Sequence, residues 1–213
     1  MVKKSVPIEE PKNPSDNVKI TAILKAAQKR FGHFGLAKTT MNEIAVDVGI
    51  SKASLYYYFP DKERLFLAVI NKEQEAFEKA AEEMIDKTGK AAGKLKQFVT
   101  LRLEFFRQLL NLGKFTHQSV TELSKPFAEE LRVRHFNIEK EIAKKLFRTG
   151  ISAGEFIRFD VEAYTDLFVT GLAGFRALTM KNTNYNLTTE DYANMDRQMK
   201  LFTEVIIKAI TKQ

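Results

Sequence analysis

The chain has 213 residues, of which 44% are hydrophobic and 29% charged, and its formal net charge is +7 at pH 7, as for an ordinary globular protein of one or two domains. The absence of cysteine excludes disulfide frameworks, thiolate metal sites and cysteine nucleophiles. No apolar run approaches the roughly 18 residues of a membrane span, and no signal peptide is recognisable, so we expect a cytoplasmic protein with no membrane partner.

The N-terminal region is polar, proline-rich and then basic. Three prolines within residues 1–15 predict a flexible tail there. Between Asn17 and Asn42 the sequence has five Lys or Arg residues and no Asp or Glu. Such a region attracts a polyanion such as DNA. A solvated helix face that happens to be basic is an equally good interpretation of the charge alone.

The rest of the chain has the periodicity of helices. Apolar residues at spacings of three and four predict a first helix through Ile20 and Phe31, with Gly32 and Gly35 as a stop and a turn. The other predicted helices cover residues 41–48, 52–59, 66–84 and 95–110, then Pro126 to Gly150, a helix capped by Asp160 that reaches Met180, and a last one capped by Thr189. We therefore predict an all-α fold with about nine helices.

The segment from Thr40 to Phe59, TMNEIAVDVGISKASLYYYF, has the features of a helix-turn-helix. Thr40 followed three residues later by Glu43 predicts a capping box. Gly49 suits the positive backbone angle of a sharp turn, and Ser51 can cap the next helix. This order of cap, turn glycine and second cap is typical of DNA-binding motifs. An αα-corner with no DNA function has the same spacing.

Three consecutive tyrosines, Tyr56, Tyr57 and Tyr58, favour DNA binding over a plain corner. Buried rings alone would favour Phe or Leu, whereas phenols and a nearby lysine can bond phosphate oxygens. One helical turn cannot expose all three rings, so at least one should pack inward. Tyr56 and Tyr57 are the candidates for that position.

The stretch FGHFGLAKTTMNEIAVDVGISKASLYYYFPDKERLF resembles the N-terminal domain of TetR-family regulators. It shares the family's Thr-Thr before the second helix, Ile-Ala within it, the turn glycine, and Leu-Tyr-x-x-Phe followed by Lys. The resemblance covers about residues 17–66. It implies a three-helix DNA-binding domain over residues 16–62 and a larger helical ligand-binding and dimerisation domain over residues 63–213.

The resemblance also implies roles for individual residues. Thr40 and Asn42 would lie near the DNA backbone or bases. The base edges would be read by Lys52, Ala53 and Ser54, and the phosphates would be near Tyr57, Tyr58 and Lys62, with the Tyr56 phenol as a further candidate. The function implied is that of a dimeric repressor, released from a pseudo-palindromic double-stranded operator by a small effector.

The C-terminal region is dense in aromatic side chains, which either line a ligand cavity or fill the core. They are Phe98, Phe105, Phe106, Phe115, Phe127, Phe136, Phe147, Phe168 and Phe175. His135 interrupts an apolar stripe and is either a core or interface histidine or a ligand contact. Glu139 and Glu141 are expected to be solvated helix charges.

The helix from Val161 to Met180 has two apolar faces. One face carries Tyr164, Phe168, Gly171 and Phe175, and the other carries Leu167, Leu172 and Leu178. The last helix likewise adds Leu201 and Val205 to its main stripe. Because two apolar faces need two partners, we predict a homodimer formed through the last two helices.

Two other functions are weighed against a regulator. A helical architectural protein that binds DNA non-specifically would also use the basic N-terminal region. A helical enzyme is disfavoured because the sequence has no serine elbow, no phosphate-binding glycine loop and no metal-spaced cluster. We therefore expect neither enzymatic activity nor a cofactor or metal ion.

Overall fold

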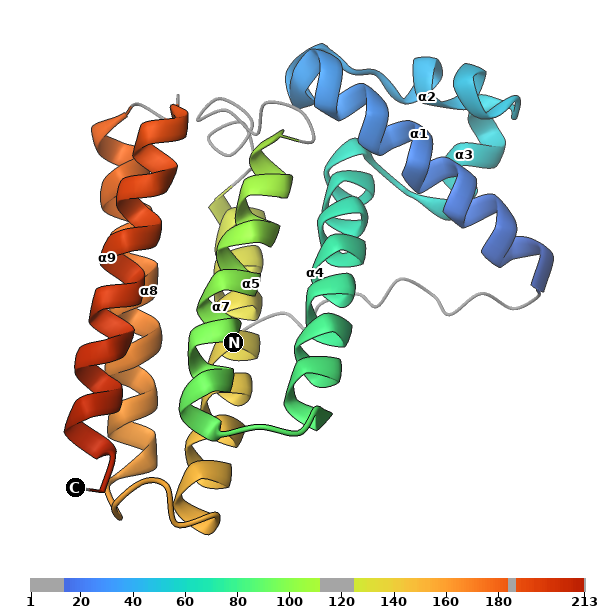
Figure 1. Cartoon of the computed structure of the whole chain (residues 1–213). Coiled ribbons are helices and arrows are strands. Elements are labelled where there is room, and N and C mark those ends of the chain that lie inside the picture. The colour runs from blue at the N-terminus through green and yellow to red at the C-terminus, as the bar shows by residue number, and fades with distance from the viewer. Residues whose placement is uncertain (1–13, 112–124, 184–186, 213) are drawn as a thin grey trace. The chain divides into compact units, whose positions relative to one another are not determined.

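A computed structural model describes residues 14–111, 125–183 and 187–212. This part of the chain contains eight helices, against about nine predicted for the whole sequence. They are α1 (Pro14–Lys38), α2 (Met41–Val48), α3 (Lys52–Tyr58), α4 (Lys62–Asp86), α5 (Ala91–Asn111), α7 (Lys125–Ser152), α8 (Val161–Asn182) and α9 (Thr189–Ile210) (Figure 1). The all-α prediction is confirmed. None of these helices has the length and apolar character needed to cross a membrane.

The chain divides into two compact units. Among the described residues, the first contains 14–73, 110–111 and 125–127, and the second contains 74–109, 128–183 and 187–212. The division therefore lies within α4, whereas the boundary predicted from the sequence, after residue 62, lies at the start of that helix.

The first unit is built on α1, α2 and α3. Its core is formed by apolar side chains from all three helices and the start of α4, among them Ile23, Phe31, Ile44, Leu55, Phe59 and Phe66. The rings of Phe31 and Phe66 meet edge to face, with centroids 5.2 Å apart. The short helices α2 and α3 bury apolar side chains in this core together with α1 and α4. They are therefore stabilised by burial as well as by their caps.

The start and end of α1 differ in detail from the prediction. The helix begins at Pro14, inside the predicted tail, because proline is tolerated in a first turn where its missing N–H has no helical partner. Residues 1–13 of that tail lie outside the described residues. Gly32 continues the helix, and Gly35, with φ at 81°, is the residue that breaks it.

The second unit contains α5, α7, α8 and α9 with the C-terminal part of α4. Its core includes Phe98, Phe147 and Phe168, all fully buried, so these three aromatics fill the core. Four more pack against it while partly exposed: Phe105, Phe106, Phe136 and Phe175. Phe115 and the side chain of Phe127 lie outside the described residues.

Two helix ends in the second unit correct the prediction, and one confirms it. Asp160 caps α8, with its side chain accepting a hydrogen bond from the Ala163 N–H. Thr188 caps α9, and Thr189 is its first helical residue. The helix expected to end at Gly150 continues to Ser152. A Cβ on Gly150 would lie 2.1 Å from the Phe156 ring, so this glycine serves packing within α7.

Candidate functional site

The helix-turn-helix has the caps that its sequence predicts. The Thr40 hydroxyl accepts a hydrogen bond from the Glu43 N–H at 3.3 Å, and Glu43 Oε2 accepts one from the Thr40 N–H at 2.9 Å. Gly49 adopts φ 75°, and the Ser51 hydroxyl accepts from the Ser54 N–H at 3.0 Å. The two caps and the turn glycine therefore produce the predicted helix ends.

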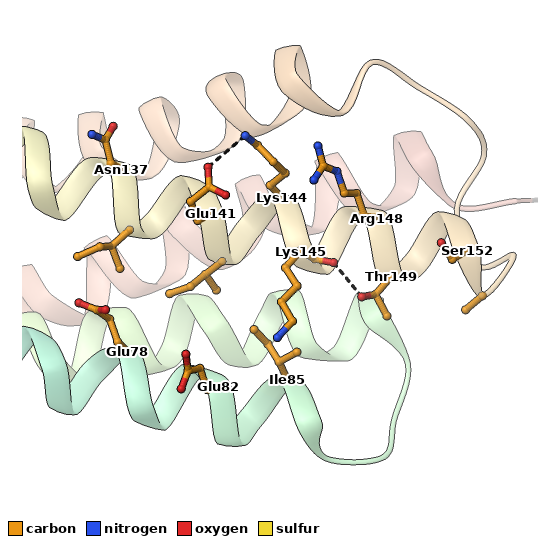
Figure 2. Close-up of a pocket in the computed structure, with 13 residues that line it drawn as sticks. Glu78, Glu82, Ile85, Asn137, Glu141, Lys144, Lys145, Arg148, Thr149 and Ser152 are labelled. Atoms are coloured by element: carbon orange, nitrogen blue, oxygen red, sulfur yellow. Dashed lines mark hydrogen bonds and ion pairs between the residues drawn. The ribbon is translucent and has the colours of Figure 1, made fainter.

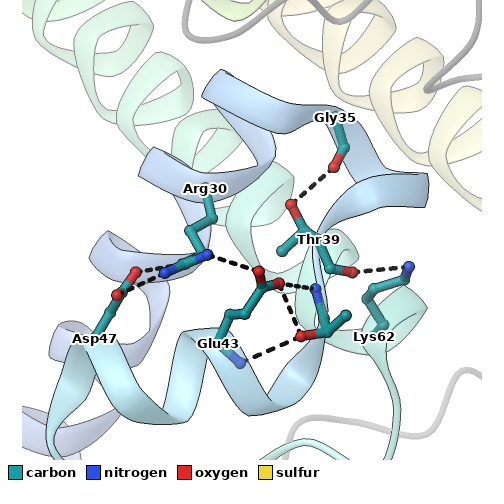
Figure 3. Close-up of polar contacts among 7 residues, drawn as sticks. Arg30, Gly35, Thr39, Glu43, Asp47 and Lys62 are labelled. Atoms are coloured by element: carbon teal, nitrogen blue, oxygen red, sulfur yellow. Dashed lines mark hydrogen bonds and ion pairs between the residues drawn. The ribbon is translucent and has the colours of Figure 1, made fainter.

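One of the five N-terminal cations is committed to holding the motif together. Arg30 on α1 makes a two-pronged pair with Asp47 on α2, and its Nη1 lies 3.2 Å from Glu43 Oε1 (Figure 3). The hydrogen bond from Arg30 lowers the pKa of the Asp47 carboxyl below its usual value. Arg30 thus fixes the angle between α1 and α2, while Lys19, Lys25, Lys29 and Lys38 remain exposed.

Lys62 holds the connection between α1 and α2. Its Nζ donates to the carbonyl oxygen of Ala37 at 3.2 Å. Figure 3 shows its second hydrogen bond, to the Thr39 carbonyl at 3.0 Å, and the one that the buried Thr39 hydroxyl donates to the Gly35 carbonyl at 2.8 Å. An ammonium group has three N–H donors, so one is left for another acceptor. The two hydrogen bonds of Lys62 could not be predicted from the sequence, because their acceptors are backbone carbonyl groups 23 to 25 residues away.

The three tyrosines separate into two exposed rings and one partly buried ring. Tyr57 is 72% exposed and Tyr56 41%, whereas Tyr58 is partly buried and its hydroxyl donates to Asp16 at 3.0 Å. The expectation that Tyr56 or Tyr57 packs inward is wrong. Tyr58 follows the buried Leu55 by three positions and therefore shares its side of α3. Burial, followed by the bond to Asp16, raises the pKa of the Tyr58 phenol.

The remaining candidate residues lie in the first turns of α2 and α3. Thr40, Asn42, Lys52 and Ala53 are exposed, and Ser54 is partly buried at the cap of α3. The Lys52 ammonium lies 5.8 Å from the centroid of the Tyr56 ring. The start of α3 therefore presents a lysine and an aromatic ring together at the surface of the first unit.

The second unit has an open groove of about 980 Å³ between α4 and α7. Figure 2 shows Glu78 and Glu82 of α4 facing α7, which contributes Lys145 and, on its side towards α8, the pair of Lys144 with Glu141. Burial raises the pKa of the Glu78 carboxyl. Among the residues described, no group of three His, Asp or Glu side chains is placed to hold a metal ion.

A buried ionic cluster lies in the core of the second unit, and the sequence did not predict it. Glu139 is 1% exposed, so the expectation of a solvated charge is wrong for it, whereas Glu141 is exposed as expected. Glu139 accepts from Arg102 Nε at 2.5 Å and from Arg176 Nη2 at 2.9 and 3.0 Å. His135, one turn earlier on α7, is partly buried beside them. The helical periodicity of α7 places Glu139 on the same face as His135, which interrupts an apolar stripe. That spacing was the sequence signal that could have predicted the burial of Glu139.

The match to a known family lies in the first unit. Residues 23–69 match the family described as bacterial regulatory proteins, tetR family. The HTH-type transcriptional regulator RutR of Escherichia coli K12 is 46% identical over 54 residues, which is 25% of this chain and 26% of RutR. The aligned part thus spans about a quarter of that relative's length.

Two other relatives extend over nearly the whole chain. The crystal structure of a transcriptional regulator from Cytophaga hutchinsonii is 40% identical, with a TM-score of 0.82, and the match covers 91% of this chain and 99% of that one. The HTH-type transcriptional regulator QacR of Staphylococcus aureus is 24% identical over 89% of this chain and 97% of its own. The fold, the helix-turn-helix and these similarities together show that the chain belongs to the TetR family of DNA-binding transcriptional regulators.

Proposed function

We propose that the chain acts as a dimeric repressor, which binds a pseudo-palindromic operator through α3 and leaves it when a small effector binds the second unit. The observation that carries the DNA-binding part is the exposed start of α3. Lys52 and Ala53 are free of the core there, while Leu55 and Phe59 anchor the helix from behind.

The chemistry of α2 and α3 supports distinct DNA contacts. Lys52 can donate to the O6 and N7 acceptors of guanine, Ala53 suits a thymine methyl group, and Ser54 is adaptable. Tyr56, Tyr57 and the third N–H of Lys62 can donate hydrogen bonds to phosphates. Thr40 and Asn42 lie at the N-terminus of α2, and a helix N-terminus also favours phosphate binding. Tyr58, whose hydroxyl is bonded to Asp16, supports the exposed rings in this scheme.

Exposed leucines support dimerisation through α8 and α9. Leu167 and Leu178 on α8 are 55% and 60% exposed, and Leu201 and Val205 on α9 are 62% and 56% exposed. Leu172, assigned from the sequence to the same face as Leu167 and Leu178, is instead fully buried in the core. Two such pairs of helices, related by a twofold axis, would form a four-helix interface.

The two glycines of α8 have different surroundings. A Cβ on Gly171 would lie 2.6 Å from the Phe202 ring, so Gly171 allows α8 and α9 to approach within one chain. A Cβ on Gly174 would meet nothing within 4 Å. Gly174 therefore remains available for close approach of a partner subunit.

In a dimer, each subunit contributes one reading head, the DNA-binding part formed by α1, α2 and α3. Release by an effector requires a ligand that binds more tightly when the two reading heads are at one separation than at another. Two heads must lie about 34 to 36 Å apart, or a multiple of that, to enter successive major grooves. A regulator of the same fold from Saccharomonospora viridis, 18% identical with a TM-score of 0.68, was solved in complex with choline. That structure supports small-molecule binding as a use of this fold.

Footprinting on the DNA upstream of the protein's own gene, at graded salt, tests the proposal. We expect a discrete footprint with two half-sites, and at least about tenfold weaker binding for Lys52→Ala, as for loss of a base contact. The exposed Lys79→Ala in the second unit removes the same charge and serves as the control. A featureless protection that Lys52→Ala and Lys79→Ala weaken equally would favour the non-specific architectural protein instead.

A further inference from the structure

The buried ionic cluster of the second unit contains more positive than negative charge. Arg102 on α5 is 5% exposed, Arg176 on α8 is 9% exposed, and both bind the one carboxylate of Glu139 on α7. Over the described ranges, no other acid pairs with either guanidinium. Two buried cations therefore share a single anion, and an uncompensated buried charge is costly.

Both guanidiniums also have buried donors with nothing to bind. The Nη1 atoms of Arg102 and Arg176 are inaccessible to water and have no hydrogen-bond partner, and neither has His135 Nε2. Arg102 Nε and Arg176 Nη2 meet on the same oxygen, Glu139 Oε1, so the two guanidiniums lie close together. Unsatisfied buried donors of this strength are rare in folded proteins and call for an acceptor.

His135 does not remove the imbalance. Burial, followed by the nearby charge of Arg102, lowers the pKa of His135 to about 4, so it is neutral near pH 7. Burial by itself raises the pKa of Glu139, but Arg102 and Arg176 outweigh it, so the net shift is downward and Glu139 is ionised. The cluster therefore has a net charge of +1.

The surroundings of the cluster are apolar and aromatic. The Arg102 guanidinium lies over the Phe77 ring at 5.1 Å, and Phe77 meets Phe105 with ring centroids 5.5 Å apart. Within one turn of the cluster, α5, α7 and α8 each carry a partly exposed aromatic: Phe105, Phe136 and Phe175 respectively. Such a site suits a ligand with one anionic group and an apolar body.

We propose that the second unit binds an organic carboxylate with an apolar body, and that Arg102 and Arg176 hold its carboxylate group beside Glu139. A carboxylate offers two acceptor oxygens, which suit the paired N–H donors of guanidinium groups. A second carboxylate would also bring the cluster to neutrality. This inference rests on the proposed effector role of the second unit and adds the chemical class of the effector.

Binding is tested on the full chain without DNA, by calorimetry and by the thermal unfolding midpoint. The probes are acetate, octanoate and phenylbutyrate, with octanol as the neutral counterpart and octyltrimethylammonium as the cationic one. We expect octanoate or phenylbutyrate to raise the midpoint, acetate to do so less, and the neutral and cationic compounds to have no comparable effect. If no carboxylate binds at millimolar concentration, or if octanol binds as well as octanoate, the proposal is overturned.

Variants of the cluster give opposite expectations. Arg102→Gln and Arg176→Gln should each weaken carboxylate binding about 10- to 100-fold, as for loss of a charge-assisted hydrogen bond. Glu139→Gln leaves two guanidiniums without an acid, so it should lower the ligand-free midpoint but enlarge the rise that octanoate produces. Arg148→Gln, at an exposed position on α7, is the control. A Glu139→Gln protein that folds but gains nothing from octanoate would contradict the assignment.

Operator release is measured separately, so the two proposals can fail independently. A carboxylate that binds wild type through Arg102 and Arg176 but leaves the DNA complex intact would refute the effector role and support the site. Release of DNA by a compound that binds equally well to Arg176→Gln would support the effector role and refute the site.

Discussion

The caps of the helix-turn-helix and the buried ionic cluster of the second unit join partners at different distances along the chain. In the helix-turn-helix, Thr40 binds Glu43 and Ser51 binds Ser54, each across three residues. In the second unit, Glu139 binds Arg102 and Arg176, each 37 residues away in sequence. The starts of α2 and α3 are thus specified by local signals, whereas the cluster depends on contacts that exist only after the helices of the second unit have packed.

The largest expected effect comes from breaking the long-range cluster. Glu139→Leu should lower the free energy of unfolding by about 3 to 5 kcal/mol, because it leaves two buried guanidiniums unpaired. Chemical denaturation of Glu139→Leu measures this loss. Glu141→Leu, two positions along the same helix and exposed, is the matched control and should change stability by less than about 0.5 kcal/mol. Equal effects of the two substitutions would remove the contrast between the units.

Acid should weaken the second unit through His135. Its folded pKa of about 4 lies below the ordinary value of 6.5, so the unfolded chain binds the extra proton between these two values. Stability is therefore complete above pH 6.5 and is lost as the pH falls towards 4, by roughly 2 to 3 kcal/mol. Denaturation of wild type and His135→Leu at several pH values measures the difference in slope. His33→Leu, which replaces an exposed histidine in the first unit, is the control.

A smaller effect is expected at the turn of the reading head. Gly49→Ala places a side chain at φ 75°, which should cost about 1 to 2 kcal/mol. Gly93→Ala in α5, where a Cβ meets nothing within 4 Å, should instead stabilise by up to about 1 kcal/mol. Thermal unfolding compares the two variants. A neutral Gly49→Ala would show that the local turn signal is dispensable.

The smallest expected effect separates the tyrosines. Tyr58→Phe removes the hydrogen bond to Asp16 and should lower stability by about 1 kcal/mol. Tyr57→Phe should leave stability unchanged and weaken DNA binding, because its hydroxyl is free for phosphate. Parallel denaturation and DNA-binding titrations measure both quantities for each variant. If Tyr57→Phe bound DNA as wild type does, the phosphate role of that phenol would be refuted.

The sequence was a better guide to helix positions than to burial. Caps at Thr40, Ser51 and Asp160 were predicted because each lies beside the backbone groups that it serves. The burial of Tyr58 follows from its spacing of three from Leu55, but the partner of its hydroxyl, Asp16, is 42 residues away and could not be predicted. Leu172 was grouped with Leu167 and Leu178, but it follows the buried Phe168 by four positions and therefore shares the face of that ring.

The amino-acid sequence by itself determined the all-α fold, the helix-turn-helix with its caps and turn glycine, and the likeness to TetR regulators. These features depend on residues within a few positions of one another, where backbone preference and capping act directly. Only the tertiary structure decided that Lys62 and Arg30 tie α1 to its neighbours and that Glu139 is buried between two arginines. A charged residue on a helix looks the same in sequence whether it faces solvent or a distant partner, and packing alone selects between the two.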